Sequence, residues 1–112
     1  SDYTFAVWHQ GVLKDIGKAY SGLTDAEILA LTKRFEALTL ERHGGLHVVK
    51  PVVVIEVAFD GLQKSKRHAS GFSMRFPRIH RVRDDKRPED ADTLEAAQAL
   101  FDAQVQSGHR EG

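Results

Sequence analysis

Residues 71–86 read GFSMRFPRIHRVRDDK, and this stretch decides which fold and which surface the sequence predicts. Phe72, Met74 and Phe76 occupy alternate positions, the spacing of side chains on one face of a strand. Pro77 cannot donate a hydrogen bond to a sheet ladder, so an edge or a bulge is expected there. Four arginines fall between residues 75 and 83, more charge than a buried strand carries. We therefore expect a long strand from Phe72 with one buried face and one basic face.

Length and composition predict a single domain over residues 1–112. The chain has 112 residues, of which 41% are apolar, and this suffices for one core. No apolar run approaches the ~20 residues of a membrane-spanning helix, so we expect no membrane partner. The sequence has no cysteine, which excludes disulfides and thiolate sites and fits a reducing compartment. It begins with Ser1, so we expect a piece of a longer chain or a processed one.

The net charge of zero hides a strong asymmetry. Residues 64–87 hold nine basic and two acidic side chains, a charge of +7, so the rest of the chain carries −7. A segment of this kind is typical of proteins that meet anions, and phosphate is the common biological anion. The alternative, a solvated basic face that only improves solubility, remains open at this point.

Elements expected before this stretch are two strands, a helix and a further strand. The hairpin lies in residues 3–19, with a turn at Gly11. Thr24 and Glu27 have the spacing of a capping box, and the helix that follows is expected to reach about Leu40 and to end at residues 43–45, HGG. Six valines in residues 48–59 then predict a long strand.

After the valine-rich strand, a loop is expected from Gly61 and a last helix over about residues 92–106. Its buried side should hold Leu94, Ala97, Phe101 and Val105. One more short strand is expected near His47 or in residues 64–68. The order favours a mainly β fold with helices (α+β). The best match is a five-stranded OB-fold barrel, closed or half-closed, over about residues 1–87, with an inserted helix and the C-terminal helix.

The basic side chains of this segment suit a phosphate backbone. Arg75, Arg81 and Arg83 would share one outward face, and the planar guanidinium makes bidentate contacts with phosphate. The preceding loop extends the same field with three further basic residues: Lys64, Lys66 and Arg67.

Two features allow more than one interpretation. Periodicity places Phe76 in the core in line with Phe72 and Met74, whereas in a nucleic-acid protein a ring beside an arginine can enter the minor groove or stack on a base. Residues 84–86, DDK, can end a strand as a turn, or can help to hold a polyphosphate. The six histidines are too scattered to predict a metal site, and no spacing suggests a catalytic triad.

The same residues resemble a known family. RFPR at residues 75–78 and RDDK at residues 83–86 look like the C-terminal signature of ATP-dependent DNA ligases. The upstream VVVIEVAFDGLQKSKRHASG and the downstream RPEDADTLEAAQALF also resemble these ligases, so the resemblance is strong over residues 52–101 and looser over residues 1–51. The whole resembles the bacterial branch.

The resemblance implies an OB domain that serves two phosphate partners in turn. Arg83 and Lys86 would orient the pyrophosphate of ATP while a lysine is adenylated, and Asp85 would hold them. The domain would then close over nicked duplex DNA and place Arg75 and Phe76 in the minor groove at the nick. The DNA-binding set implied in this way is Lys64, Lys66, Arg67, Arg75, Phe76, Arg78 and Arg81.

The resemblance further implies partners and a location. The full enzyme would be a nucleotidyltransferase of DNA replication, recombination and repair that uses ATP and a divalent cation, Mg²⁺, with neither bound by this domain alone. The domain would meet the enzyme's own adenylation domain in a bacterial, nucleoid-associated, cytoplasmic setting. The family adenylates a lysine in a Lys-x-Asp-Gly motif, which this sequence lacks, so we expect an inactive fragment of a larger ligase. Two alternatives remain: a stand-alone nucleic-acid-binding OB module without a catalytic role, and an RNA ligase or capping enzyme.

Overall fold

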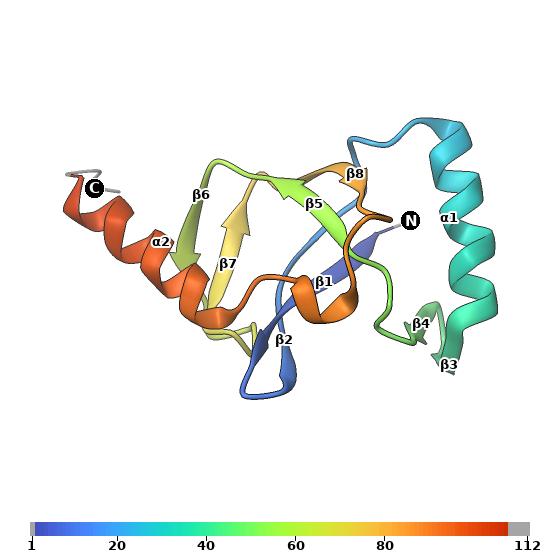
Figure 1. The fold of residues 1–112 in the computed structure, drawn as a ribbon, viewed down its shortest axis with the longest axis horizontal. Helices are drawn as coiled ribbons and strands as arrows, with labels where there is room; N and C mark the ends of the chain where they lie inside the picture. The colour runs from blue at the N-terminus through green and yellow to red at the C-terminus, as the bar shows by residue number, and fades with distance from the viewer. Residues whose placement is uncertain (1, 108–112) are drawn as a thin grey trace.

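The computed structural model of this chain describes residues 2–107. It is mainly β with two α-helices, as expected for an α+β fold (Figure 1). The elements in chain order are β1 (Tyr3–His9), β2 (Val12–Ala19), α1 (Asp25–Leu38), β3 (Thr39–His43), β4 (Leu46–Val49), β5 (Ile55–Ala58), β6 (Gly61–Lys64), β7 (Phe72–Arg75), β8 (Arg78–Val82), a 3-10 turn (Pro88–Asp90) and α2 (Leu94–Gln106).

The expected first hairpin is confirmed. β1 and β2 pair antiparallel, and Gln10 and Gly11 form the turn with φ angles of 52° and 79°. Two positive φ values in a two-residue turn match the right-handed twist of the strands that it joins. β2 also packs beside β7, so this hairpin covers one side of the strands that carry the basic residues.

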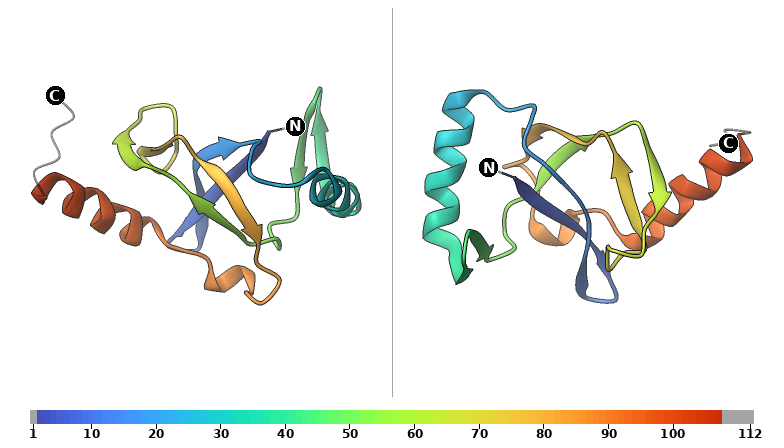
Figure 2. Two further views of the ribbon diagram at one scale, coloured as in Figure 1. Left: turned by 90° about the horizontal axis from the view of Figure 1, so that it is seen from above. Right: turned by 180° about the vertical axis from the view of Figure 1, so that it is seen from behind.

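β5–β8 and β6–β7 form the two halves of one bent hairpin (Figures 1 and 2). The pairs Ala58–Arg78 and Gly61–Arg75 have the same register, so extending it across the break places Asp60 opposite Phe76. The long strand expected from Phe72 is therefore interrupted at residues 76–77, where Pro77 cannot donate to the ladder. The loop expected from Gly61 is wrong, because residues 61–64 form β6.

A closed five-stranded barrel is not confirmed. The eight strands of the described chain form four two-stranded ladders, and no sheet closes on itself. Single hydrogen bonds bring the ladders together: Ile79 N donates to the Ser21 carbonyl at 2.9 Å, and Ser70 N donates to the Asp15 carbonyl at 3.3 Å. The strands thus surround a shared core without a continuous hydrogen-bonded wall.

α1 begins as the sequence predicts and ends differently. The Thr24 hydroxyl accepts from Glu27 N at 3.1 Å, and the Glu27 carboxylate accepts from Thr24 N at 2.8 Å, which confirms the capping box. The helix ends at Leu38 and passes directly into β3, so residues 43–45 do not end it. Gly44 instead lies in the turn of the β3–β4 hairpin, with a φ of 62°. β4 contains His47 and confirms the short strand expected there.

The valine-rich residues 48–59 do not form one strand. β4 ends at Val49 and β5 begins at Ile55, and the residues between them, among which is Pro51, lie outside the strands. In Figures 1 and 2, α1 and the β3–β4 hairpin lie at one end of the molecule and α2 at the other, with the remaining strands between them.

The core lies between the strands and α2. It is formed by Val7, Ile16, Leu62, Phe72 and Ala97. The expected inner face of α2 is confirmed for Leu94, Ala97 and Phe101, which lie in or against the core. Val105, in the last turn of the helix, is 50% exposed, so the expectation that it is buried is wrong.

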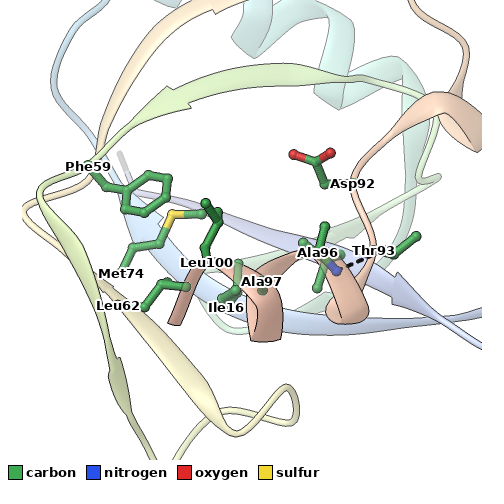
Figure 3. A pocket seen from close by; sticks show the side chains of 10 residues that line it. Ile16, Phe59, Leu62, Met74, Asp92, Thr93, Ala96, Ala97 and Leu100 are labelled. Carbon is green, nitrogen blue, oxygen red and sulfur yellow. Dashed lines mark hydrogen bonds between the residues drawn. The ribbon is translucent and has the colours of Figure 1, made fainter. Parts of the chain in front are cut away.

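A cavity of about 40 Å³ remains beside α2 (Figure 3). Phe59, Met74 and Leu100 are among its lining side chains. Pockets for small ligands usually have volumes of several hundred Å³, so this space holds no nucleotide. None of the helices within residues 2–107 combines the length and the apolar character that crossing a membrane requires.

Candidate nucleic-acid and phosphate interface

Phe76 lies on the surface at the break between β7 and β8. Its side chain is 68% exposed, so the core position that periodicity predicts is wrong. The neighbouring Phe72 and Met74 do pack in or against the core, as predicted. The alternation ends at Phe76 because the backbone there has a φ of 52°, which turns the side chain away from the strand direction.

The backbone around Phe76 is held on both sides. Its carbonyl accepts from the Arg78 guanidinium at 2.8 Å, and the same guanidinium nitrogen lies 3.0 Å from the Asp60 carboxylate. Asp60 N also donates to the Arg75 carbonyl at 2.9 Å. Arg78, predicted as a DNA contact, is therefore already engaged by Asp60 and by the Phe76 carbonyl.

Arg81 and Arg83 converge on Glu56. The Oε1 atom of Glu56 accepts from Arg81 Nε at 3.0 Å and from the Arg83 Nη1 atom at 2.9 Å. These bonds, that from Arg81 above all, lower the pKa of Glu56, so the carboxylate is charged at neutral pH. Arg75 lies in β7, on the other side of the break, so the three arginines do not share one continuous strand as expected.

Asp85 forms a two-pronged ion pair with Arg83. Arg83 Nε donates to one oxygen at 2.9 Å, and the Nη2 atom donates to the other at 2.8 Å. These hydrogen bonds hold the pKa of Asp85 well below its ordinary range and raise the pKa of Arg83. Arg83 is only 24% exposed and is bonded to two acids, so the outward face expected for it is wrong.

Arg83 nevertheless keeps donors for another acceptor. A guanidinium has five N–H groups, and the bonds to Asp85 and Glu56 use three of them. Lys86 is exposed next to this pair, and its ammonium makes no hydrogen bond or ion pair with the residues that the structure describes. Residues 83–86, the tail of β8, thus combine a fixed guanidinium with an exposed ammonium group.

Asp84 joins this tail to α1. Its carboxylate accepts from the Arg34 guanidinium at 2.8 Å, across fifty positions of sequence. The backbone closes a turn here, because Lys86 N donates to the Arg83 carbonyl at 3.3 Å. The turn interpretation of residues 84–86 and the polyphosphate interpretation are therefore compatible, since the turn leaves Lys86 exposed.

The loop after β6 carries the remaining basic residues. Lys66 and Arg67 are exposed, and the loop is held by Ser65, whose hydroxyl is 2.7 Å from the His68 ring. Lys64 is exposed at the end of β6, with its ammonium 5.8 Å from the centre of the Phe101 ring. This loop joins β6 to β7 at the end away from Phe76, so the predicted DNA-binding residues occupy both ends of this ladder.

Phe76, predicted to contact DNA, and Arg83, predicted to orient pyrophosphate, lie beyond opposite ends of β8. Seven positions separate Phe76 from Arg83, or roughly 20 Å along a strand, since each residue advances about 3.3 Å. Neither the cavity of Figure 3 nor a wider surface hollow beside Trp8 is lined by a predicted site residue. Residues 2–107 also contain no group of three or more acidic or histidine side chains placed to hold a metal ion.

Sequence reasoning missed two acids that organise the site. Glu56 binds Arg81 and Arg83, and Asp60 holds the backbone around Phe76. Charge counting could not find them, because each is a single acid outside the basic segment. The signal that could have found Glu56 is its place in a strand of apolar residues, where a carboxylate needs a partner.

The sequence of this chain is similar to those of known DNA ligases. The sequence model described as "ATP dependent DNA ligase C terminal region" matches residues 1–86. The chain is 57% identical over 104 residues to a probable DNA ligase of Koribacter versatilis and 54% identical over 111 residues to one of Opitutus terrae. These alignments cover 93% and 96% of this chain but only 18% and 11% of those relatives. DNA ligase 1 of Korarchaeum cryptofilum is 41% identical over 107 residues, 94% of this chain and 20% of that protein.

Proposed function

Because this chain belongs to the ATP-dependent DNA ligase family, as a C-terminal region of such an enzyme, we propose that it contacts nicked duplex DNA and orients the pyrophosphate of ATP during ligation. The chain spans about a fifth or less of the length of the relatives named above, so the remaining parts of the reaction belong to other residues of the enzyme. The chain would be an OB domain whose strands surround the core without closing into one hydrogen-bonded barrel.

One observation carries this proposal: exposed Lys86 lies beside Arg83, which Asp85 and Glu56 hold in place. The leaving pyrophosphate gains negative charge as the bond to the α-phosphate breaks. Cations that are already in position stabilise this charge without reorganisation. Lys86 and the two remaining N–H groups of Arg83 suit this task, and Asp85 acts as a positioning residue.

The adenylated lysine would come from the enzyme's own adenylation domain. None of the lysines here is followed by the x-Asp-Gly pattern, so the chain alone should be inactive in ligation. The carboxylates of Glu56 and Asp85 are already bonded to arginines, so Mg²⁺ would be held by groups outside this cluster. On this proposal the protein acts at the bacterial nucleoid, where chromosomal nicks arise.

The opposite end of β8 would meet DNA in a later step. Phe76 offers an exposed ring between Arg75 and Arg78, and an apolar ring can enter the minor groove and open a base step. Lys64, Lys66 and Arg67, at the other end of the β6–β7 ladder, would contact the phosphate backbone. Arg81 would contact it from the Arg83 side, beside Glu56. Because roughly 20 Å separates the two ends, the domain would turn one end and then the other toward the reacting centre.

A second candidate function is a nucleic-acid-binding module without a catalytic role. It is favoured by one observation: Arg83 is already bonded to two carboxylates and has little exposed surface. The relatives named above are DNA ligases, which favours a DNA ligase over an RNA ligase or a capping enzyme.

The experiment that separates these functions replaces Lys86 in the full-length ligase. Lys86→Ala should slow self-adenylation by about 10²-fold, the usual effect of removing one group that stabilises developing charge. Sealing of a pre-adenylated nick should change less than about threefold. Lys33→Ala, at an exposed position in α1, is the matched control and should alter neither step. A module without a catalytic role predicts no effect of Lys86→Ala on adenylation.

A further inference from the structure

The left-handed backbone conformation of Phe76, with a φ of 52°, must be supported by its surroundings. Two non-glycine residues of the described chain have a positive φ, and the other, Gln10, lies in a tight hairpin turn beside a glycine. Phe76 has no such turn. A side chain in the left-handed region costs free energy and persists only where the surrounding structure enforces it.

Asp60 holds the backbone around Phe76 at two points. Its backbone N–H holds the Arg75 carbonyl at 2.9 Å, on the N-terminal side of Phe76. Its carboxylate holds the Arg78 guanidinium at 3.0 Å, and that guanidinium holds the Phe76 carbonyl at 2.8 Å. The carbonyls on both sides of the Phe76 α-carbon are thus tied to Asp60, directly or through Arg78.

Asp60 is itself fixed by its neighbour. Phe59 packs against the core and lines the cavity of Figure 3. The Asp60 side chain is exposed, as expected for alternate residues on opposite sides of an extended backbone. The register of the bent hairpin places Asp60 opposite Phe76. The packing of Phe59 against the core therefore fixes the position of Asp60.

We propose that Asp60 and Arg78 are positioning residues that hold Phe76 in its left-handed conformation and present its ring to the bases at a nick. This inference rests on the proposed function of Phe76 and reassigns Arg78, which binds the Phe76 carbonyl instead of a phosphate. The Arg78 and Asp60 side chains are 48% and 55% exposed, and exposed ion pairs add little to stability. The pair therefore acts on the shape of the surface more than on the stability of the fold.

The sign of one substitution tests this inference. Asp60→Asn removes a negative charge near DNA, so electrostatics alone predicts tighter binding to nicked duplex. If Asp60 and Arg78 form a clamp on Phe76, its loss predicts weaker binding, by about three- to tenfold. Binding is measured by fluorescence anisotropy with the full-length protein. Asp84→Asn is the matched control, because Asp84 forms a similar exposed ion pair with Arg34 at 2.8 Å. It should leave binding unchanged or strengthen it.

Measuring Asp60→Asn in a protein that also carries Phe76→Ala separates this inference from the proposed function. Phe76→Ala should weaken binding to nicked duplex by about 10-fold or more, the usual effect of losing a stacked aromatic ring. In the Phe76→Ala background, Asp60→Asn should cause no further weakening. If Phe76→Ala has no effect, the proposed DNA contact is wrong. If Phe76→Ala weakens binding while Asp60→Asn strengthens it as Asp84→Asn does, only the clamp is wrong.

Arg78→Lys provides a variant that keeps the charge. Lysine retains the attraction to phosphate but lacks the planar fork that bridges the carboxylate and the carbonyl. Weakening that disappears in the Phe76→Ala background supports the clamp. Equal weakening in both backgrounds means that Arg78 contacts DNA directly, and overturns it. Melting temperatures identify any variant that fails to fold, and Arg78→Lys then decides the question if Asp60→Asn is the one that unfolds.

Discussion

Replacing Gly22 by alanine tests the packing that holds β8 in place. Gly22 has a φ of 107°, and an added Cβ would overlap the carbonyl oxygen of Ile79 and lie 2.9 Å from its carbonyl carbon. Ile79 is only 1% exposed, and its N–H donates to the Ser21 carbonyl at 2.9 Å. The new methyl group cannot be accommodated unless β8 moves away from residues 21–22.

The size of the effect follows from three contributions. A non-glycine residue at this φ costs about 1–2 kcal/mol. Loss of the Ile79–Ser21 hydrogen bond costs about 1 kcal/mol, and forced displacement of a packed side chain costs about 1–3 kcal/mol. A destabilisation of about 4 kcal/mol would lower the melting temperature by roughly 10–20 °C in a domain of this size.

Two other glycines provide matched controls in a thermal unfolding experiment followed by circular dichroism. Gly44 has a φ of 62° but open space around its α-carbon, so Gly44→Ala should cost about 1–2 kcal/mol from the backbone alone. Gly45 has open space and no positive φ, so Gly45→Ala should be close to neutral. If Gly22→Ala lowers the melting temperature no more than Gly44→Ala, the close approach of β8 to residues 21–22 is wrong.

Two further predictions concern charge. Because Arg83 holds the pKa of Asp85 below its unfolded value, the ion pair stabilises the fold fully above the ordinary aspartate pKa of about 3.9, and this stability is lost as the pH falls further. Asp85→Asn should therefore flatten the loss of melting temperature below pH 4, and an unchanged acid profile would contradict the ion pair. Binding of duplex DNA should fall with salt with a logarithmic slope of about −3 or steeper, as expected for three or more neutralised phosphates, and a flat titration would contradict the basic face.

The sequence predicts those elements whose signals are local. The capping box at Thr24, the turn at residues 10–11 and the alternation of Phe72 with Met74 each depend on neighbouring residues, and the structure confirms them. The boundaries of the strands were harder to predict, because valine at residues 52–54 suits a strand wherever a partner exists. Here the strand begins only at Ile55, and one backbone bond continues beyond it, from Arg83 N to the Val54 carbonyl at 2.8 Å.

The surface at Phe76 could not be predicted from periodicity, because its exposure depends on contacts with Asp60 and Arg78 across a break in the ladder. The same applies to Arg83, which the basic strand face predicts to project outward. Glu56 lies 27 positions earlier in the sequence, and only the pairing of β5 with β8 brings its carboxylate to Arg83. The sequence can mark Glu56 as an acid that needs a partner, but it does not show that the partner is Arg83. The roles of these residues in ligation stay predictions.

The most direct test of the central claim compares two variants in two assays. Lys86→Ala and Phe76→Ala lie at opposite ends of β8, and each is measured for self-adenylation and for sealing of a pre-adenylated nick in the full-length ligase. The proposal predicts a crossed result, in which Lys86→Ala impairs adenylation and spares sealing, and Phe76→Ala does the reverse. Equal losses of both steps in both variants would contradict the claim that the two ends of β8 meet different phosphate partners.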